Sequence, residues 1–98
     1  MDITFTGTLW EWTGQGAWCF ISLPTDYYAD IKTLSQAPKK GFGSIRVEAT
    51  IGNTTWKTSI FPDSKTKTYL LPVKKAVRSQ ECLLLDQPTE VRLRLIEV

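Results

Sequence analysis

The stretch from Gly41 to Pro62, GFGSIRVEATIGNTTWKTSIFP, decides the fold. Hydrophobic and polar residues alternate over 45–51, which is the period of a strand with one buried face. Gly52 and Asn53 follow, and glycine at the first central position suits a type II′ hairpin turn, where φ must be positive. Residues 54–61 are rich in threonine, isoleucine and aromatic residues, which favour a second strand. The stretch therefore predicts two antiparallel strands joined by a two-residue turn.

The chain before this hairpin is predicted to form two strands and a helix. Residues 2–10 alternate, with Gly7 on the inner face, where it indicates a bend or a close neighbouring backbone. Residues 17–23 are apolar on both faces, so we expect this strand to be covered on both, by a helix or by a partner chain. Pro24 is expected to open the helix, because its fixed φ suits the first helical position. The predicted buried stripe of this helix consists of Tyr27, Tyr28, Ile31 and Leu34.

The chain after the hairpin repeats the same order. The polar segment 62–68 is a predicted exposed turn, and residues 69–71 form a short strand. Pro72 is expected to open a second helix, and residues 91–95 alternate as a last strand. The predicted apolar face of the second helix consists of Val73, Ala76 and Val77.

The two halves thus share the order strand, strand, helix, strand (ββαβ), with Gly52 and Asn53 at the junction. One such unit leaves open sheet edges, whereas two units related by a pseudo-twofold axis can close into a barrel. We therefore predict a mainly β fold with one domain over residues 1–98: a small six-stranded closed barrel with two short capping helices. The alternative is an open antiparallel sheet with both helices on one face.

Composition and charge limit the classes of function. The 98 residues include 12 basic and 10 acidic side chains, and a net charge of +2 does not by itself indicate nucleic acid or an acidic membrane as partner. The start of the chain lacks the basic and apolar run of a signal peptide, and no stretch approaches the roughly 18 apolar residues of a membrane span. We expect a cytoplasmic protein that does not enter a membrane.

Residues suited to catalysis or metal binding are scarce. The sequence has no histidine, the commonest general base, and Cys19 lies inside a strand without an imidazole partner. Cys19 and Cys82 are expected to be reduced thiols, and two isolated cysteines lack the spacing of zinc ligands. We predict no catalytic residue, no metal site and no cofactor, so that an enzyme is disfavoured.

A candidate binding site lies at the start of the second helix, where Lys74, Lys75 and Arg78 follow one another closely. Backbone N–H groups at that helix end would add to their attraction for an anion. Lys57 and Ser59 of the central hairpin are further candidates for this anion pocket. The alternative is a solvated helix face beside the barrel.

Tryptophan is the second candidate binding feature. Trp12, Trp18 and Trp56 are expected to gather near one barrel mouth, where aromatic walls and cations would suit a flat or anionic ligand, a nucleobase or a single strand. The alternative is that these rings fill the core and interfaces. Trp10, out of phase with the inner face of its strand, is the best candidate for an exposed or interface ring.

Three blocks of the sequence together resemble a known family. They are LWEWTGQGAWCFISLP (residues 9–24), the hairpin stretch 41–62 and YLLPVKKAVR (69–78), and they follow the family's order and spacing over nearly the whole chain. The chain resembles the DUF1905 family, small bacterial domains of unknown function that occur alone or fused to a domain described as bacteriocin-protection-like. The resemblance implies a small closed β-barrel with short helices, and it brings no established activity.

The resemblance weakens near the end of the chain. The family pattern has a glycine where Cys82 stands and a Gly-Asp turn where Asp86, Gln87 and Pro88 stand. The conformation of residues 80–90 therefore stays open at this point.

Two functions are compatible with these features. The first is a non-catalytic binding or adaptor domain for a small anionic ligand or a partner protein. The second is a nucleic-acid-binding dimer, because Leu71 to Arg78 and the last strand are similar to the strand–proline–helix–strand unit of swapped-hairpin transcription regulators and antitoxins, a fold-level analogy. A homodimer through the apolar strand 17–23 is a third hypothesis.

Overall fold

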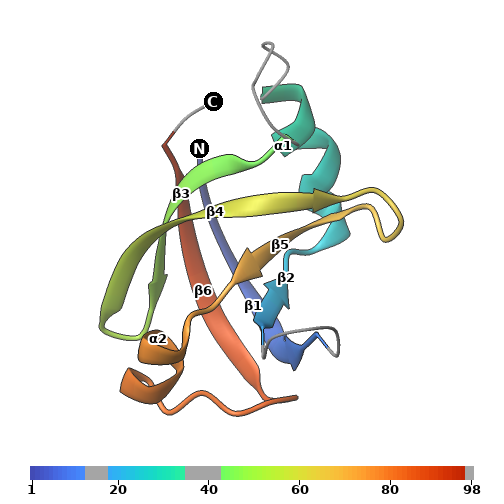
Figure 1. Ribbon diagram of the computed structural model, residues 1–98. Helices are drawn as coiled ribbons and strands as arrows, with labels where there is room; N and C mark the ends of the chain where they lie inside the picture. Colours follow the sequence, from blue (N-terminus) through green and yellow to red (C-terminus); the bar gives the residue numbers. More distant parts are fainter. Residues whose placement is uncertain (13–17, 35–42, 97–98) are drawn as a thin grey trace.

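The computed structural model describes residues 1–12, 18–34 and 43–96 (Figure 1). The elements, in chain order, are β1 (Asp2–Glu11), β2 (Cys19–Ser22), the 3₁₀ helix η1 (Thr25–Tyr27), α1 (Tyr28–Leu34), β3 (Ile45–Ile51), β4 (Thr54–Asp63), β5 (Thr68–Pro72), α2 (Lys75–Gln80) and β6 (Pro88–Leu95). The glycine-bearing connection 13–16 and the polar segment 35–40, both of which the sequence predicts to be loops, lie outside the described residues.

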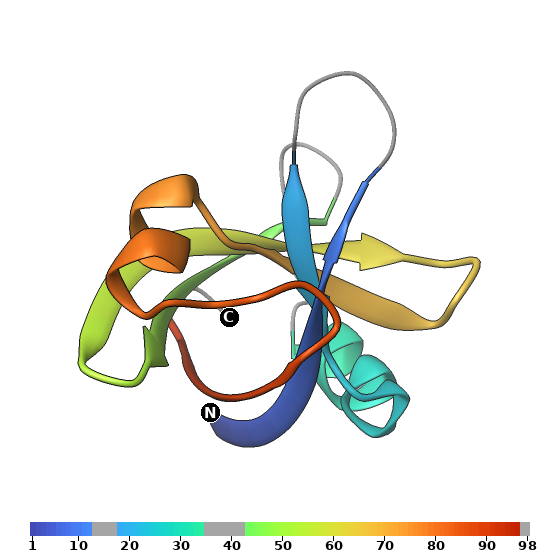
Figure 2. The same ribbon diagram turned by 90° about the horizontal axis from the view of Figure 1, so that it is seen from below.

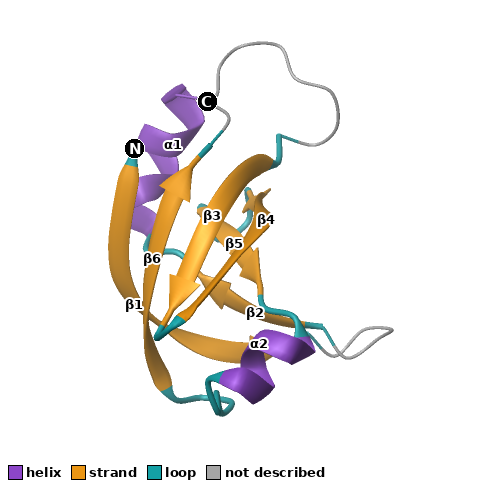
Figure 3. Ribbon diagram, turned by 90° about the vertical axis from the view of Figure 1, so that its left-hand side faces the viewer, coloured by secondary structure: helices purple, strands orange, loops and turns teal. Residues whose placement is uncertain are grey.

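The six strands form a closed barrel in the order β1-β2-β5-β4-β3-β6, with β6 returning to β1. Every neighbouring pair is antiparallel. Exchanging β1, β2 and β3 with β4, β5 and β6 reproduces the same set of neighbours, as the predicted pseudo-twofold repeat requires. The two helices lie at opposite ends of the barrel (Figures 1 and 3). The predicted barrel is confirmed, and the alternative of an open sheet is wrong.

The central hairpin has the predicted register. Ile51 pairs with Thr54 across the turn, and Ile45 pairs with Ile60 at the far end of the ladder. Gly52 has φ of +58°, which a residue with a Cβ adopts only at a cost. Local chemistry at this turn therefore fixes which residues of β3 face the core.

The core fills the barrel with the inward side chains of all six strands and one residue from each helix. Thr68, at the start of β5, is the only buried polar side chain in the described part of the chain, and its hydroxyl donates a hydrogen bond to the carbonyl of Leu23. The most deeply buried side chains are Ile3, Leu9, Ile21, Ile31, Ile45, Ile60, Leu71, Val47, Val73, Val77 and Val91.

Gly7 occupies a point of close packing, but its closest neighbour is a side chain and not the backbone that the sequence indicated. A Cβ added there would lie 2.5 Å from Cγ2 of Ile21, a side chain with no exposed surface. The carbonyl oxygen of Ser22 would lie 3.4 Å away on another side. Glycine is therefore required at this position so that β1 and β2 can pack at this distance.

Both predicted helix starts are shifted toward the C-terminus. Pro24 precedes η1 with extended backbone (φ −57°, ψ 143°), and α1 begins only at Tyr28. Pro72 pairs with Phe20 as the last residue of β5. The N–H of Val73 then donates to the carbonyl of Cys19 over 2.9 Å, which keeps the backbone extended past the proline.

The packing of the helices agrees with the predicted stripes except at two positions. Ile31 of α1 is fully buried, and Tyr27 and Tyr28 pack against the core; the Leu34 side chain lies outside what is described. Val73 and Val77 are buried near α2, but Ala76 is exposed. The prediction for Ala76 is wrong because the helix starts later than expected.

The segment 81–87, left open by the sequence, passes across the same barrel end as α2 (Figure 2). It contains two residues with positive φ, Cys82 at 54° and Asp86 at 64°. The N–H of Asp86 donates to the carbonyl of Leu9 over 2.8 Å, which holds the segment on β1. Positive φ favours glycine, and Cys82 stands where the resemblance implies a glycine.

Candidate functional site

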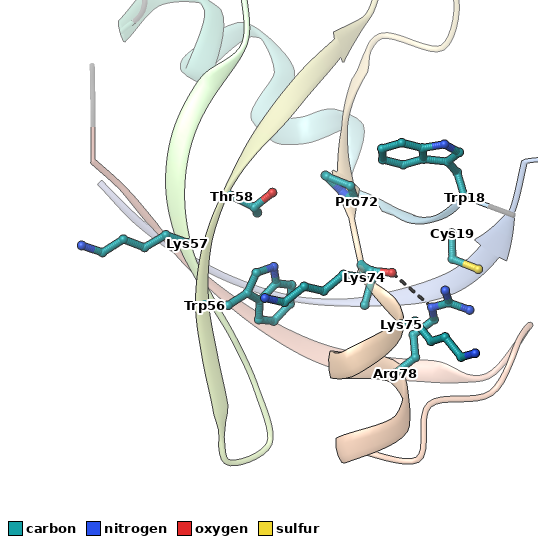
Figure 4. A pocket seen from close by; sticks show the side chains of 10 residues that line it. Trp18, Cys19, Trp56, Lys57, Thr58, Pro72, Lys74, Lys75 and Arg78 are labelled. Atoms are coloured by element: carbon teal, nitrogen blue, oxygen red, sulfur yellow. Dashed lines mark hydrogen bonds between the residues drawn. The ribbon is translucent and has the colours of Figure 1, made fainter. Parts of the chain in front are cut away.

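A cleft of about 330 Å³ lies between the start of α2, strand β4 and the adjoining ends of β2 and β5 (Figure 4). We call it the cationic cleft. Its lining residues are Trp18, Cys19, Trp56, Lys57, Thr58, Pro72, Val73, Lys74, Lys75 and Arg78. Six of the eight predicted ligand-binding residues are among them: Trp18, Trp56, Lys57, Lys74, Lys75 and Arg78.

The inner wall of the cleft is buried and apolar. Trp56 is only 8% exposed, and Cys19 and Val73, which also line the cleft, are buried. Trp18 stands at the rim and is 55% exposed, so its ring can meet a bound molecule. The cleft therefore combines a buried aromatic wall with an open aromatic edge.

Three cations at the start of α2 also line the cleft. Lys74 and Lys75 are exposed, and Figure 4 shows Lys74 extending toward Trp56. Arg78 is half-buried, and its Nε donates to the carbonyl oxygen of Val73 over 3.2 Å, which orients the guanidinium and leaves its terminal N–H groups available. No carboxylate is among the described lining residues, and none of these cations forms an ion pair with a described residue.

The hairpin contributes different side chains from those predicted. Lys57 lines the cleft, but in Figure 4 it extends away from the other labelled side chains, and Glu48 stands opposite it in the β3–β4 ladder. Ser59 is not a lining residue, whereas Thr58 is. Trp56 and Thr58 share one face of β4 and Ser59 the other, because successive side chains of a strand alternate. The sequence reasoning missed Thr58, although this period alone would have indicated it.

The contribution of the helix itself to anion binding is smaller than expected. With only six residues, α2 has a weak macrodipole, so the attraction comes from the three side-chain cations. The first turn of α2 contains no acidic residue, and Lys74 at the N-cap makes no side-chain capping hydrogen bond. This helix start therefore has the opposite charge to the one that stabilises a helix.

Trp12 lies on a different surface, which we call the aromatic face. It is an apolar groove on the outside of the barrel, lined by Trp10, Trp12, Trp18, Phe20, Phe61 and Leu70. The prediction that Trp12, Trp18 and Trp56 gather at one mouth is met only in part, because Trp18 borders both surfaces while Trp12 and Trp56 lie on separate ones. Trp10 is half-buried, and its Nε1 donates to Oγ of Ser22 over 2.9 Å.

The described residues contain no group of three or more histidine, cysteine or acidic side chains that could hold a metal ion. Cys19 is a buried free thiol and Cys82 an exposed one. No helix within the described ranges is both long and apolar enough to cross a bilayer.

Comparison with known proteins bears on the family of the chain. No curated protein matches the sequence. The family described as "Domain of unknown function (DUF1905)" matches residues 5–93. This match spans β1 to β6 almost entirely, and it agrees with the three sequence blocks and with the closed barrel. The chain therefore belongs to the DUF1905 family.

Proposed function

We propose that this domain is a non-catalytic binding module whose cationic cleft takes a small anion that carries a flat ring, such as a mononucleotide. The observation that carries the proposal is the presence of Lys74, Lys75 and Arg78 in one cleft with Trp56 and Trp18, with no carboxylate among its described lining residues. Unpaired cations at a partly apolar wall attract an anion more strongly than cations in open solvent. The two tryptophans offer aromatic surface to a planar group.

The start of α2 gives independent support. Asp26 and Asp30 lie in the first turns of η1 and α1, where negative charge is favourable, whereas α2 starts with two lysines. A local arrangement that lowers helix stability is typical of a functional site, where the residue is needed for another purpose. An anion bound between these lysines would remove the unfavourable charge.

The arrangement favours a binding module over an enzyme. The sequence has no histidine, and the one thiol in the cleft, Cys19, is buried in a strand next to apolar residues. Two unpaired cysteines agree with a reducing compartment, so we place the domain in the bacterial cytoplasm. A neighbouring protein or domain would then respond to the occupied cleft, which is the adaptor role predicted from the sequence.

The proposal is tested by thermal unfolding at low salt in the presence of inorganic phosphate, adenosine, and adenosine and uridine monophosphate. A ligand that binds only the folded state raises the apparent unfolding temperature. The two mononucleotides should raise it, adenosine should not, and phosphate alone should have an intermediate effect. The shift should shrink as salt is added, because Lys74 and Lys75 are exposed.

Charge-removing variants locate the site. Lys74→Gln combined with Lys75→Gln should abolish the shift with mononucleotide, because both ammonium groups leave the cleft. Lys65→Gln, on the exposed β4–β5 turn, removes a single charge away from the cleft; it is the control and should leave the shift intact. The proposal fails if neither mononucleotide nor phosphate stabilises the protein, or if the control loses the shift equally.

A further inference from the structure

The aromatic face continues the cationic cleft, and the two surfaces share Trp18. The groove of the aromatic face has a volume of about 400 Å³ and lies over β1, β2, β4 and β5. Trp12, Trp18 and Phe61 keep 48%, 55% and 41% of their surface exposed. Three large exposed rings in one groove are unusual on a small domain and mark a binding surface.

The rings of this face are ordered relative to one another. Trp18 and Phe20 are nearly parallel, with 6.2 Å between ring centroids and 12° between planes. Trp10 lies 5.3 Å from Phe20, and the hydrogen bond from its Nε1 to Ser22 holds it in place. The face thus presents prearranged π-surfaces, and the described residues that line it include no charged side chain.

We infer that single-stranded nucleic acid binds across both surfaces, with phosphate groups on the cations of the cleft and neighbouring bases stacked on the aromatic face. This inference rests on the proposed function and extends the cleft from one nucleotide to several. Aromatic platforms beside a cationic groove bind single strands without reading the sequence, because every base has a π-face. A polyanion also complements Lys74, Lys75 and Arg78, which have no carboxylate partner among the described residues.

Other occupants fit these observations less well. An extended peptide that adds a strand needs a free sheet edge, and every strand of the closed barrel already has two neighbours. A second copy packed symmetrically on this face would bring two cationic clefts together, because Trp18 belongs to both surfaces. Duplex nucleic acid keeps its bases stacked inside and would leave the exposed rings without partners.

The test uses fluorescence anisotropy with a labelled ten-residue deoxythymidine strand, the same strand in a duplex, and thymidine monophosphate as competitor. We expect the single strand to bind at least tenfold more tightly than the mononucleotide, since several bases of the strand can stack on the aromatic face. Trp12→Ala combined with Phe61→Ala should weaken strand binding roughly tenfold or more and leave the mononucleotide unaffected. Leu84→Ala, which removes an exposed apolar side chain elsewhere, is the control and should change neither.

The salt dependence separates the two surfaces. The affinity for the strand should fall as salt is added. A plot of the logarithm of the binding constant against the logarithm of the salt concentration should have a slope of roughly −0.7 per phosphate contacted. Lys74→Gln with Lys75→Gln should flatten this slope, whereas Trp12→Ala with Phe61→Ala should lower the affinity at an unchanged slope.

Three results would overturn the inference. The first is that the single strand binds no more tightly than thymidine monophosphate, although the mononucleotide still binds. This result would contradict the inference but not the proposed function of the cleft. Another is a strand affinity that survives Trp12→Ala with Phe61→Ala. The third is a dimer in sedimentation at micromolar concentration that these two substitutions dissociate. If the protein binds neither the single strand nor the mononucleotide, the result would instead contradict the proposed function of the cationic cleft.

Discussion

Oγ1 of Thr54 donates a hydrogen bond to Oε2 of Glu81 over 2.6 Å. Thr54 is the first residue of β4, directly after the hairpin turn, and Glu81 directly follows α2. The bond therefore joins two segments 27 residues apart, each of which carries one wall of the cationic cleft. It holds the helix with Lys74 and Arg78 against the strand with Trp56.

Thr54→Val should lower the free energy of unfolding by about 1 kcal/mol, because the partly buried Glu81 carboxylate loses a donor. Urea denaturation measures the effect. Thr6→Val is the matched control: Thr6 is exposed on β1 and has no hydrogen-bond partner among the described side chains. Equal losses in the two variants would show that the hydroxyl of Thr54 contributes nothing specific.

Gly52→Ala should destabilise the protein by about 2 kcal/mol, since φ of +58° strains a residue with a Cβ by about 1–2 kcal/mol. The added Cβ would also overlap the Glu81 carboxylate and displace it from Thr54. Gly43→Ala is the control for strain alone, because φ is +83° there and the nearest atom, Cγ of Pro62, would be 3.5 Å away. When Glu81 is already replaced by alanine, Gly52→Ala should lower the free energy of unfolding only by the amount that backbone strain contributes. An unchanged cost would contradict the proposed overlap.

Cys82→Gly should stabilise the protein. Positive φ at Cys82 costs about 1–2 kcal/mol, and part of the gain is lost to the greater freedom of glycine in the unfolded chain. The expected net gain of about 0.5–1 kcal/mol corresponds to a rise in unfolding temperature of roughly 3–6 °C. Asp86→Gly should give a smaller gain in stability, because aspartate tolerates the left-handed region better than cysteine does. A fall in unfolding temperature for Cys82→Gly would contradict the conformation described for residues 81–87.

Gly7→Ala should destabilise the barrel by about 1–3 kcal/mol, because the methyl group would press on the fully buried Ile21. Ile21→Leu moves the branch point away from Cβ and removes the Cγ2 atom that causes the clash. The double variant should therefore lose less stability than the sum of the two single variants, as measured by chemical denaturation. If the losses in the free energy of unfolding are simply additive, a methyl group at position 7 does not clash with the side chain at position 21.

Lys74→Asp should raise stability and remove ligand binding at the same time. Aspartate is a favourable N-cap residue and its charge suits the start of α2, so a gain of about 1 kcal/mol is expected. Lys74→Gln is the control, since it removes the charge from the cleft without providing a strong cap. Unfolding and mononucleotide titration of both variants test the conflict between helix stability and the cleft. Stabilisation with intact binding would show that Lys74 has no part in the site.

The sequence by itself determined the barrel and its repeat. Alternation along β1, β3 and β6, a glycine that accepts positive φ at the hairpin turn, and the order ββαβ in each half are all local signals. These signals can be read from the sequence because each depends on only a few neighbouring residues. Six of the eight candidate residues that were selected from local patterns line one cleft in the structure.

Only the tertiary structure decided which surfaces those residues form. Closure through β2, β5 and β4 places Cys19 and Trp18 across from Trp56 and Thr58, while Trp12 falls on the aromatic face. The hydrogen bond from Val73 to Cys19 delays α2 and exposes Ala76. These outcomes depend on pairings between segments far apart in the chain, so no local pattern around each residue contains them.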